Sequence, residues 1–252
     1  MKKIKVKLVT LGNLKYPVDF SIVENWKSEI FEAHHVDQIQ ALPNSDGEDW
    51  SYSDAQLSTL LVPDSDYDFT IGIINARLED NFYLRPIENN VGVLSLYETA
   101  EILHYSNLTL ESFITRIIYE ICGIYLESSR TISANAFALV HDDTRNCLYD
   151  LAPNKADIIF STASPVICEQ CKARIMGGQV PREFIATTEK ELKKIKKQRY
   201  YRMMDFVKAH PRTAILITSG TALILNIVAN FIYDCIKPPV IKAIAYVSGL
   251  LG

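Results

Sequence analysis

The most constraining feature of this sequence is a run of twenty residues, Ala214–Tyr233, that contains no charge. As an α-helix, residues 213–233 span about 31 Å, which is enough to cross the hydrocarbon core of a bilayer. A buried helix of a soluble protein is the alternative, because the run also contains asparagine, threonine, serine and glycine. Soluble core helices seldom stay uncharged over this length, so we predict a transmembrane helix over residues 213–236.

A basic segment precedes the predicted membrane helix. Between Glu189 and Arg212 there are nine Lys or Arg residues and three acidic ones. The basic residues are Lys190, Lys193, Lys194, Lys196, Lys197, Arg199, Arg202, Lys208 and Arg212. Positive charge beside a span favours the cytoplasmic side. We therefore predict a single-pass protein of the cell inner membrane, anchored near its C-terminus, with a cytoplasmic N-terminal domain.

Four parts are expected along the chain. Residues 1–180 form a cytosolic domain, and residues 181–212, opened by Pro181, form a basic amphipathic linker helix. The membrane helix follows, and then a short apolar tail over residues 237–252. The sequence Lys237-Pro238-Pro239 is expected to end the helix, because proline lacks a backbone N–H donor. The tail is too short to span a bilayer and is expected to lie at its surface.

Apolar periodicity predicts alternating strands and helices in the cytosolic domain. Strands are expected over residues 3–10, 35–42, 68–75, 82–84 and 91–97. Helices are expected over residues 19–33, 51–61 and 108–126. This order predicts a layered α+β or α/β domain.

One cluster of potential metal ligands stands in the cytosolic domain. Cys168 and Cys171 form a Cys-x2-Cys pair, and His141 and Cys147 precede it in the sequence. A Cys-x2-Cys pair directs two thiolates at one ion, and a distant pair completes a tetrahedron. In a reducing compartment, metal binding is favoured over disulfides. The residues predict a structural zinc site made by three cysteines with either His141 or Asp142; unrelated reduced thiols are the alternative.

The run Phe69–Cys171 resembles the archaemetzincins, a family of small zinc metallopeptidases. That family has a helix with the motif HExxHxxGxxH, then Cys-x4-Cys-x-Met, and a distal CxxC. In this resemblance His141 corresponds to the third histidine, Cys147 to a cysteine of the Cys-x4-Cys pair, and Cys168 and Cys171 to the distal pair. The resemblance implies an α+β fold, a metzincin-like mixed sheet with helices, followed by the amphipathic and transmembrane helices.

The sequence departs from the archaemetzincin pattern at the catalytic positions. In the segment that corresponds to HExxH, Tyr119 and Gly123 replace the two histidines, and only Glu120 remains as a potential general base. Asp142 replaces the first cysteine, and Tyr149 replaces the methionine. A catalytic zinc ion of this class needs three imidazoles. We therefore expect no catalytic residue, unless Glu120 acts as one, and interpret Glu120 as a surface residue of a helix on a non-catalytic binding platform.

The predicted membrane helix has a polar face. At 100° per residue, Ser219, Asn226, Asn230 and Tyr233 fall within about 60° of one another. Polar groups in hydrocarbon are stabilised by other helices or by water. This stripe is therefore predicted to pack helices in a homo-oligomer or to line a pore.

Two functional hypotheses follow. In the first, the chain is an oligomeric membrane effector whose cytosolic domain senses a ligand and controls a pore. This architecture is similar to bacterial anti-phage effectors of the cyclic-oligonucleotide and Hailong type, which implies a nucleotide or oligonucleotide ligand made by a partner enzyme. In the second, the chain is a membrane-tethered zinc hydrolase or peptidase.

Overall fold

The computed structural model describes residues 2–39, 41–132, 139–197 and 199–250. The chain divides into two compact units, Met1–Gln198 and Arg199–Gly252. The first unit is built around a five-stranded sheet, and the second consists of helices. Each unit is described separately below.

The sheet of the first unit is mixed. Its strands follow the order β2 (Phe31–Ile39), β1 (Ile4–Leu11), β3 (Phe69–Ile74), β5 (Val91–Ser95) and β4 (Leu84–Ile87). The first four run parallel to one another, whereas the edge strand β4 pairs antiparallel with β5. The central strands β3 and β5 are buried throughout, which explains why they are continuous apolar runs. The α+β class and the mixed sheet expected from the sequence are confirmed.

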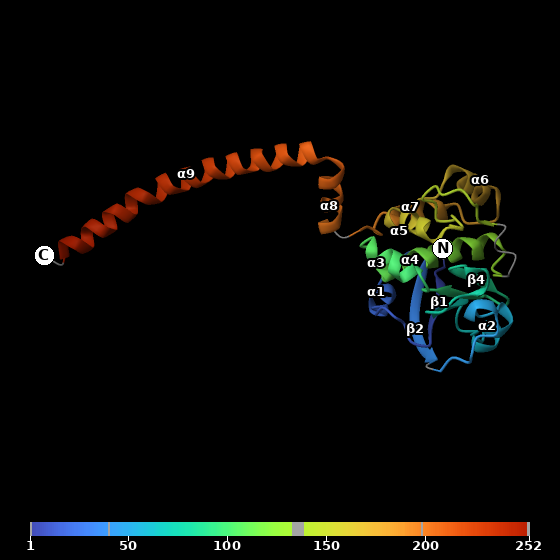
Figure 1. The fold of residues 1–252 in the computed structure, drawn as a ribbon. Helices are drawn as coiled ribbons and strands as arrows, with labels where there is room; N and C mark the ends of the chain where they lie inside the picture. Colours follow the sequence, from blue (N-terminus) through green and yellow to red (C-terminus); the bar gives the residue numbers. More distant parts are fainter. Residues whose placement is uncertain (1, 40, 133–138, 198, 251–252) are drawn as a thin grey trace. The chain divides into compact units, whose positions relative to one another are not determined.

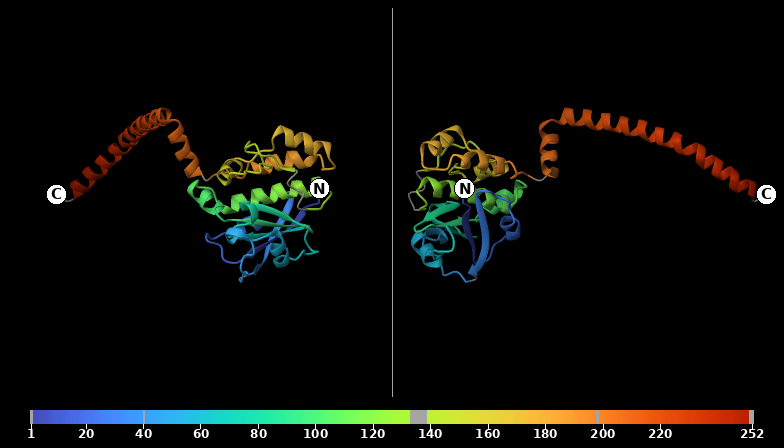
Figure 2. Two further views of the ribbon diagram at one scale, coloured as in Figure 1. Left: turned by 45° about the vertical axis from the view of Figure 1, so that its right-hand side comes forward. Right: turned by 180° about the vertical axis from the view of Figure 1, so that it is seen from behind.

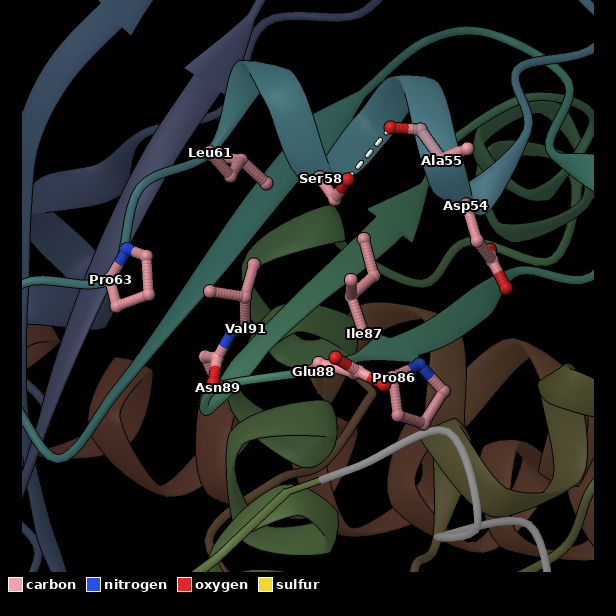
Figure 3. A pocket seen from close by; sticks show the side chains of 10 residues that line it. All are labelled: Asp54, Ala55, Ser58, Leu61, Pro63, Pro86, Ile87, Glu88, Asn89 and Val91. Atoms are coloured by element: carbon pink, nitrogen blue, oxygen red, sulfur yellow. Dashed lines mark hydrogen bonds between the residues drawn. The ribbon is translucent and has the colours of Figure 1, made fainter.

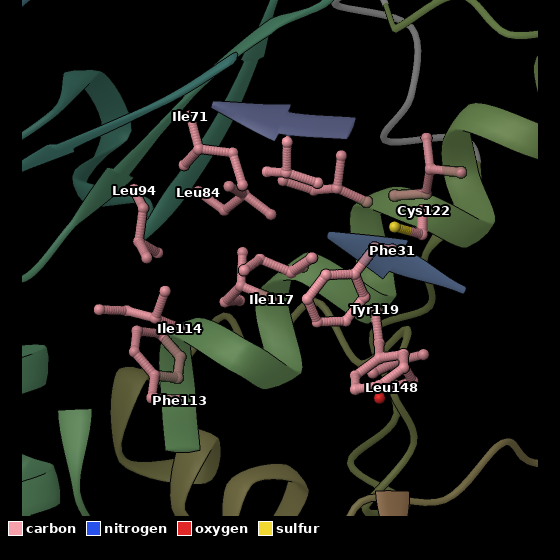
Figure 4. Close-up of a cluster of buried hydrophobic side chains, with 14 of the residues drawn as sticks. Phe31, Ile71, Leu84, Leu94, Phe113, Ile114, Ile117, Tyr119, Cys122 and Leu148 are labelled. Carbon is pink, nitrogen blue, oxygen red and sulfur yellow. The ribbon is translucent and has the colours of Figure 1, made fainter. Parts of the chain in front are cut away.

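Helices cover both faces of this sheet (Figures 1 and 2). On one face, Leu57 of α2 (Asp54–Leu60) packs with Leu11 and Val93. On the other, α4 (Leu110–Glu127) lies along the sheet, with α3 (Thr99–Tyr105) before it in the chain. Figure 4 shows Ile71 and Leu94 of the sheet close to Ile114 and Ile117 of α4, and all four are fully buried. The main core therefore lies between the sheet and α4.

A third layer covers the other side of α4. It contains α5 (Ile158–Ala163), α6 (Glu169–Gly177) and α7 (Glu183–Leu192), which lie above α4 in Figure 1. We call residues 139–197 the C-terminal lobe. Every residue of α4 from Phe113 to Leu126 is buried, as in a helix with protein on all sides. Three short 3₁₀ turns, Glu48–Trp50, Glu79–Asn81 and Lys155–Asp157, connect other elements.

Two helix predictions were wrong. Residues 19–33 form only the short α1 (Phe20–Glu24), and Phe31 begins strand β2. Parallel pairing with β1 buries Phe31 and Ala33 on one face of the sheet, so tertiary pairing overrides the apparent helical spacing. The continuous helix expected from Pro181 is instead two helices, α7 and α8 (Arg199–Ala209). Phe184, Leu192 and Ile195 are buried, so α7 belongs to the first unit.

The second unit consists of α8 and α9 (Pro211–Leu250). Within the described residues, one helical segment, Pro211–Tyr233, is long and apolar enough to cross a membrane, with a mean hydropathy of 1.9. None of it is buried in the structure, unlike the core helix of a soluble protein. The predicted stop at residues 237–239 is not observed, since α9 continues to Leu250. A proline removes one N–H donor, and the other hydrogen bonds of the helix remain.

The C-terminal lobe packs tightly against α4 at Gly123. A Cβ atom added there meets the Tyr149 hydroxyl oxygen at 1.9 Å. We expect Gly123→Ala to destabilise the first unit by roughly 1–3 kcal/mol through overpacking. Urea unfolding of the full chain in detergent micelles, followed by tryptophan fluorescence, measures this change.

The matched control is Gly177→Ala in α6. The described structure leaves no atom within 4 Å of a Cβ added at Gly177, so this variant should unfold at the wild-type urea concentration or above. The double variant Gly123→Ala with Tyr149→Phe should recover part of the loss. Equal unfolding midpoints for Gly123→Ala and Gly177→Ala contradict the packing described here.

Candidate metal centre

The four residues His141, Cys147, Cys168 and Cys171 come together in the C-terminal lobe. One potential ligand atom from each lies within 4.8 Å of the others. Ligands of a tetrahedral zinc ion with Zn–S bonds of 2.3 Å are about 3.8 Å apart, so no pair in the cluster needs to contract by more than about an ångström to hold one. Three thiols and one imidazole are a donor set typical of structural zinc. The residues therefore fit zinc.

Backbone hydrogen bonds place these ligands. His141 N–H donates to the Tyr149 carbonyl at 3.1 Å, and Leu148 N–H donates to the Val166 carbonyl at 2.7 Å. Cys168 is the N-cap of α6 and Cys171 lies in its first turn. The lobe thus brings two loop residues to the start of one helix.

The orientation of His141 suits metal binding through Nε2. Its Nδ1 lies 3.0 Å from the Asp143 carbonyl oxygen and 3.4 Å from Asp150 Oδ1. Since a carbonyl only accepts, Nδ1 carries the proton and Nε2 keeps its lone pair. Nε2 lies 3.5 Å from the Cys168 sulfur. Among the described residues the fourth member of the cluster is therefore His141, and Asp142 is exposed outside it.

The cluster favours a thiolate at Cys147. The pKa of Cys147 is lowered to about 4, chiefly because the Cys171 thiol donates a hydrogen bond to it. The backbone N–H groups of Cys168 and Tyr149 add to this effect, at 3.3 and 3.5 Å from the sulfur. The same interaction with Cys147 raises the pKa of Cys171. Metals bind the deprotonated sulfur, so one ligand of the set is already in its binding form.

Asp150 supports two of the ligands from outside the cluster. It is 1% exposed, and its Oδ2 accepts the N–H groups of Arg145 at 3.0 Å and Cys147 at 2.9 Å. Its Oδ1 faces the His141 ring. Such carboxylates fix the orientation of a histidine ligand. The sequence analysis missed Asp150, and its position three residues after Cys147 carries no signal that separates it from other acidic residues.

The prediction that Glu120 is a surface residue was wrong. Glu120 is 2% exposed, and its Oε2 lies 3.0 Å from Nη1 of the buried Arg116. Burial nevertheless raises the pKa of Glu120 to about 7, because the loss of hydration outweighs the attraction of Arg116. Arg116 also donates from Nη2 to the Leu148 carbonyl at 2.9 Å, which links α4 to the lobe. Glu120 is thus part of the packing between two layers.

Tyr119 and Gly123, which flank Glu120 on α4, also make packing contacts. The Tyr119 hydroxyl donates to Glu191 Oε2 at 2.6 Å and accepts the Trp26 indole N–H at 2.8 Å. At Gly123, the Tyr149 hydroxyl fills the space of a side chain. Glu191 was missed, although its spacing from Phe184 and Thr188 on one face of α7 is a signal that it is buried.

The other described histidines lie elsewhere. His35 Nε2 is 2.9 Å from the Thr10 hydroxyl, and its ring stacks on Phe20. His104 stacks on Tyr16. His141 is the histidine of the metal cluster. Among the described residues, the structure therefore brings together one set of potential ligands, at the predicted Cys147, Cys168 and Cys171 with His141.

Comparison with known proteins gives one structural similarity. No family model matches the sequence, and a search of curated proteins finds no match. The crystal structure of archaemetzincin from Methanopyrus kandleri is similar to this chain, with 18% identity and a TM-score of 0.46. The similarity covers 69% of this chain and 94% of that one. Values this low carry no conclusion about activity, so the function is argued below from the residues of this chain.

The metal centre predicts that zinc stabilises the fold. Cys171→Ser and His141→Ala should lose bound zinc, and Cys171→Ser should unfold the C-terminal lobe, because binding energy at such sites is folding energy. Zinc content per chain and protection from protease in detergent micelles measure the two effects. Chelation of the wild-type protein should give the same loss of protection.

Two matched variants serve as controls. Asp142→Ala stands beside His141 in an exposed position, and Cys122→Ala removes a buried thiol of α4. Both should retain zinc. If the cysteine variants remain fully protected from protease after chelation, the metal is not structural.

The raised pKa of Glu120 gives a pH dependence. Between the ordinary pKa of 4.5 and the folded value of about 7, the folded state binds more protons at this group than the unfolded state. The stabilisation is therefore full below pH 4.5 and is lost as the pH rises through 7, by on the order of 3 kcal/mol. Urea unfolding at pH 5 and pH 8 should show this loss in the wild type and a smaller one in Glu120→Gln. If the wild-type protein gains stability between pH 5 and pH 8 relative to Glu120→Gln, the predicted pH dependence is wrong.

Proposed function

We propose that this chain is an oligomeric membrane effector whose N-terminal unit is a zinc-stabilised platform and whose α9 forms a pore with other copies. The observation that carries this proposal is the exposed polar stripe on an otherwise apolar helix that is long enough to span a bilayer. The segment Pro211–Tyr233 has 23 residues, or about 35 Å as a helix. The basic residues before it support a cytoplasmic first unit and a single-pass arrangement in the inner membrane.

The polar stripe of α9 supports association between copies. Asn230 Nδ2 donates to Asn226 Oδ1 at 3.0 Å, and both side chains are exposed. This bond uses one of the four N–H donors that two amides carry. In hydrocarbon, hydrogen bonds between helices contribute about 0.6 to 2 kcal/mol each. In a symmetric homo-oligomer each copy would present Ser219, Asn226 and Asn230 to the axis, together with Tyr233 near the end of the span.

The threonines of α9 behave differently from the asparagines. The Thr218 hydroxyl donates to the Ala214 carbonyl at 2.6 Å, and the Thr221 hydroxyl donates to the Ile217 carbonyl at 2.8 Å. These hydroxyls are satisfied within their own helix. The asparagine amides are therefore the groups with most to gain from a neighbouring helix or from water in a pore.

Ligand sensing and a role in anti-phage defence belong to the same proposal. Both rest on the architectural similarity to cyclic-oligonucleotide and Hailong effectors alone. A recess of about 450 Å³ lies between α2 and the β4–β5 hairpin, and Figure 3 shows the side chains that line it. Asp54 and Glu88 are among the ten residues that line it, and none of the ten is Lys or Arg. This recess is unsuited to phosphate groups, and we do not assign a nucleotide ligand to it.

A membrane-tethered zinc hydrolase is the alternative. It needs a metal with an open coordination position and a base that reaches a bound water. In the described part of the chain, the metal cluster has four protein ligands, and Glu120 is paired with Arg116. Tyr119 and Gly123, one turn apart on α4, are occupied by packing contacts. These contacts support a binding platform over an enzyme.

The pore proposal predicts that the asparagines carry ion flux. Asn226→Leu with Asn230→Leu should leave membrane insertion intact, because it makes the span more apolar. Ion flux through the purified protein in liposomes should fall at least tenfold, because a leucine-lined constriction tends to dewet. Flux assays and any growth arrest on overexpression measure the effect.

The matched control changes the opposite face of the same helix. Ile224→Leu with Val228→Leu keeps both positions apolar and exposed, so flux should stay at the wild-type level. If both double variants behave alike, α9 is an anchor and the pore proposal fails.

A further inference from the structure

Helix α8 carries an exposed apolar face. At 100° per residue, five apolar or aromatic side chains lie on one side of α8, and Arg202, Asp205 and Lys208 lie on the other. The five are Tyr200, Met203, Met204, Phe206 and Val207, and their exposed fractions range from 38% to 60%. We call these five residues the apolar face of α8. Large exposed apolar patches mark interaction sites.

The position of α8 relative to α9 suggests what covers this face. The two helices share His210: its N–H donates to the Phe206 carbonyl at 2.8 Å, and its carbonyl accepts the Ala214 N–H at 3.0 Å. The Phe206 and His210 rings lie 5.3 Å apart across this junction. The chain bends here, so that α8 does not continue the axis of α9 (Figure 1). If α9 crosses a bilayer from Pro211, the adjoining end of α8 lies at the bilayer surface. From there the axis of α8 turns away from the direction of the span.

The positive charge of α8 and the residues beside it indicates which kind of surface the helix binds. Between Arg199 and Arg212 there are four basic residues and one acidic residue, Asp205. Basic residues close to a bilayer are attracted to anionic headgroups within about a Debye length. An apolar face of methionine and aromatic side chains, with basic residues around it, is typical of helices that lie in the plane of the interface. Headgroup binding and apolar insertion thus favour the same orientation.

We infer that α8 is an in-plane amphipathic helix that binds the anionic lipid surface of the cytoplasmic leaflet, with Tyr200, Met203 and Phe206 inserted below the headgroups. This inference rests on the proposed membrane span of α9. It assigns a lipid partner to the first helix of the second unit. The apolar face of α8 is then buried by lipid, and its depth depends on the anionic content of the leaflet.

Tryptophan scanning of the full chain in vesicles tests the inference. Tyr200→Trp and Tyr201→Trp are adjacent, chemically equal changes about 100° apart, and Tyr201 points away from the apolar face. Each is compared with the parent chain, which contains Trp26 and Trp50. Vesicles contain phosphatidylglycerol with phosphatidylcholine brominated near the glycerol end of its chains. The fluorescence added by Tyr200→Trp should fall about twofold, and that added by Tyr201→Trp should change little.

Two further measurements separate the possible failures. In vesicles of phosphatidylcholine alone, quenching at position 200 should weaken, because the anionic attraction is lost. Ile224→Trp, quenched by bromine deep in the chains, reports the span of α9. Quenching of Ile224→Trp with none at Tyr200→Trp overturns the inference and leaves the span intact. If, in addition to this result, the fluorescence of Tyr200→Trp changes when the protein is diluted in lipid, a second copy of the chain covers the apolar face of α8. No quenching at either position overturns the proposed span as well.

Discussion

The structure of the first unit depends on the burial of α4 on all sides. The sheet covers one side, and the C-terminal lobe must be held in place over the other. The part of the lobe that holds the metal cluster has isolated bridges, His141 with Asp150 and Cys147 with Val166, in place of long strands. Such a segment gains little from backbone pairing alone. The metal cluster joins the same bridges to the start of α6, and can therefore supply the cross-link that the lobe needs.

The same burial determines what α4 can do chemically. Arg116 ties α4 to the Leu148 carbonyl, Tyr119 is tied to Glu191 of α7, and Tyr149 fills the space over Gly123. Positions on a helix that are used for packing on both sides are not available to bind a substrate and a metal-bound water. Helix α4 accordingly serves as a packing element of the first unit. The second unit, which is exposed along its apolar length, supplies the proposed membrane function.

Much of the fold can be predicted from the sequence where a local pattern decides the structure. The continuous apolar runs of β3 and β5 and the length of α4 identify those elements. The helix prediction over residues 19–33 was wrong because the pairing of β2 with β1 is not encoded locally. For the metal cluster, Cys-x2-Cys has a spacing that can be recognised. The choice of His141 over Asp142, and the support from Asp150, depend on the bridges that fold the loop back. The burial of Glu120 was missed because the lobe that covers it lies far along the chain.

The account requires one metal ion per chain, held by protein ligands only. Zinc-edge X-ray absorption of the purified full chain, together with its metal content, tests this requirement directly. One zinc per chain with three sulfur ligands and one nitrogen ligand is the result expected for Cys147, Cys168, Cys171 and His141. A second zinc per chain, or a zinc with mostly nitrogen and oxygen ligands and a bound water, contradicts the platform and supports a hydrolase.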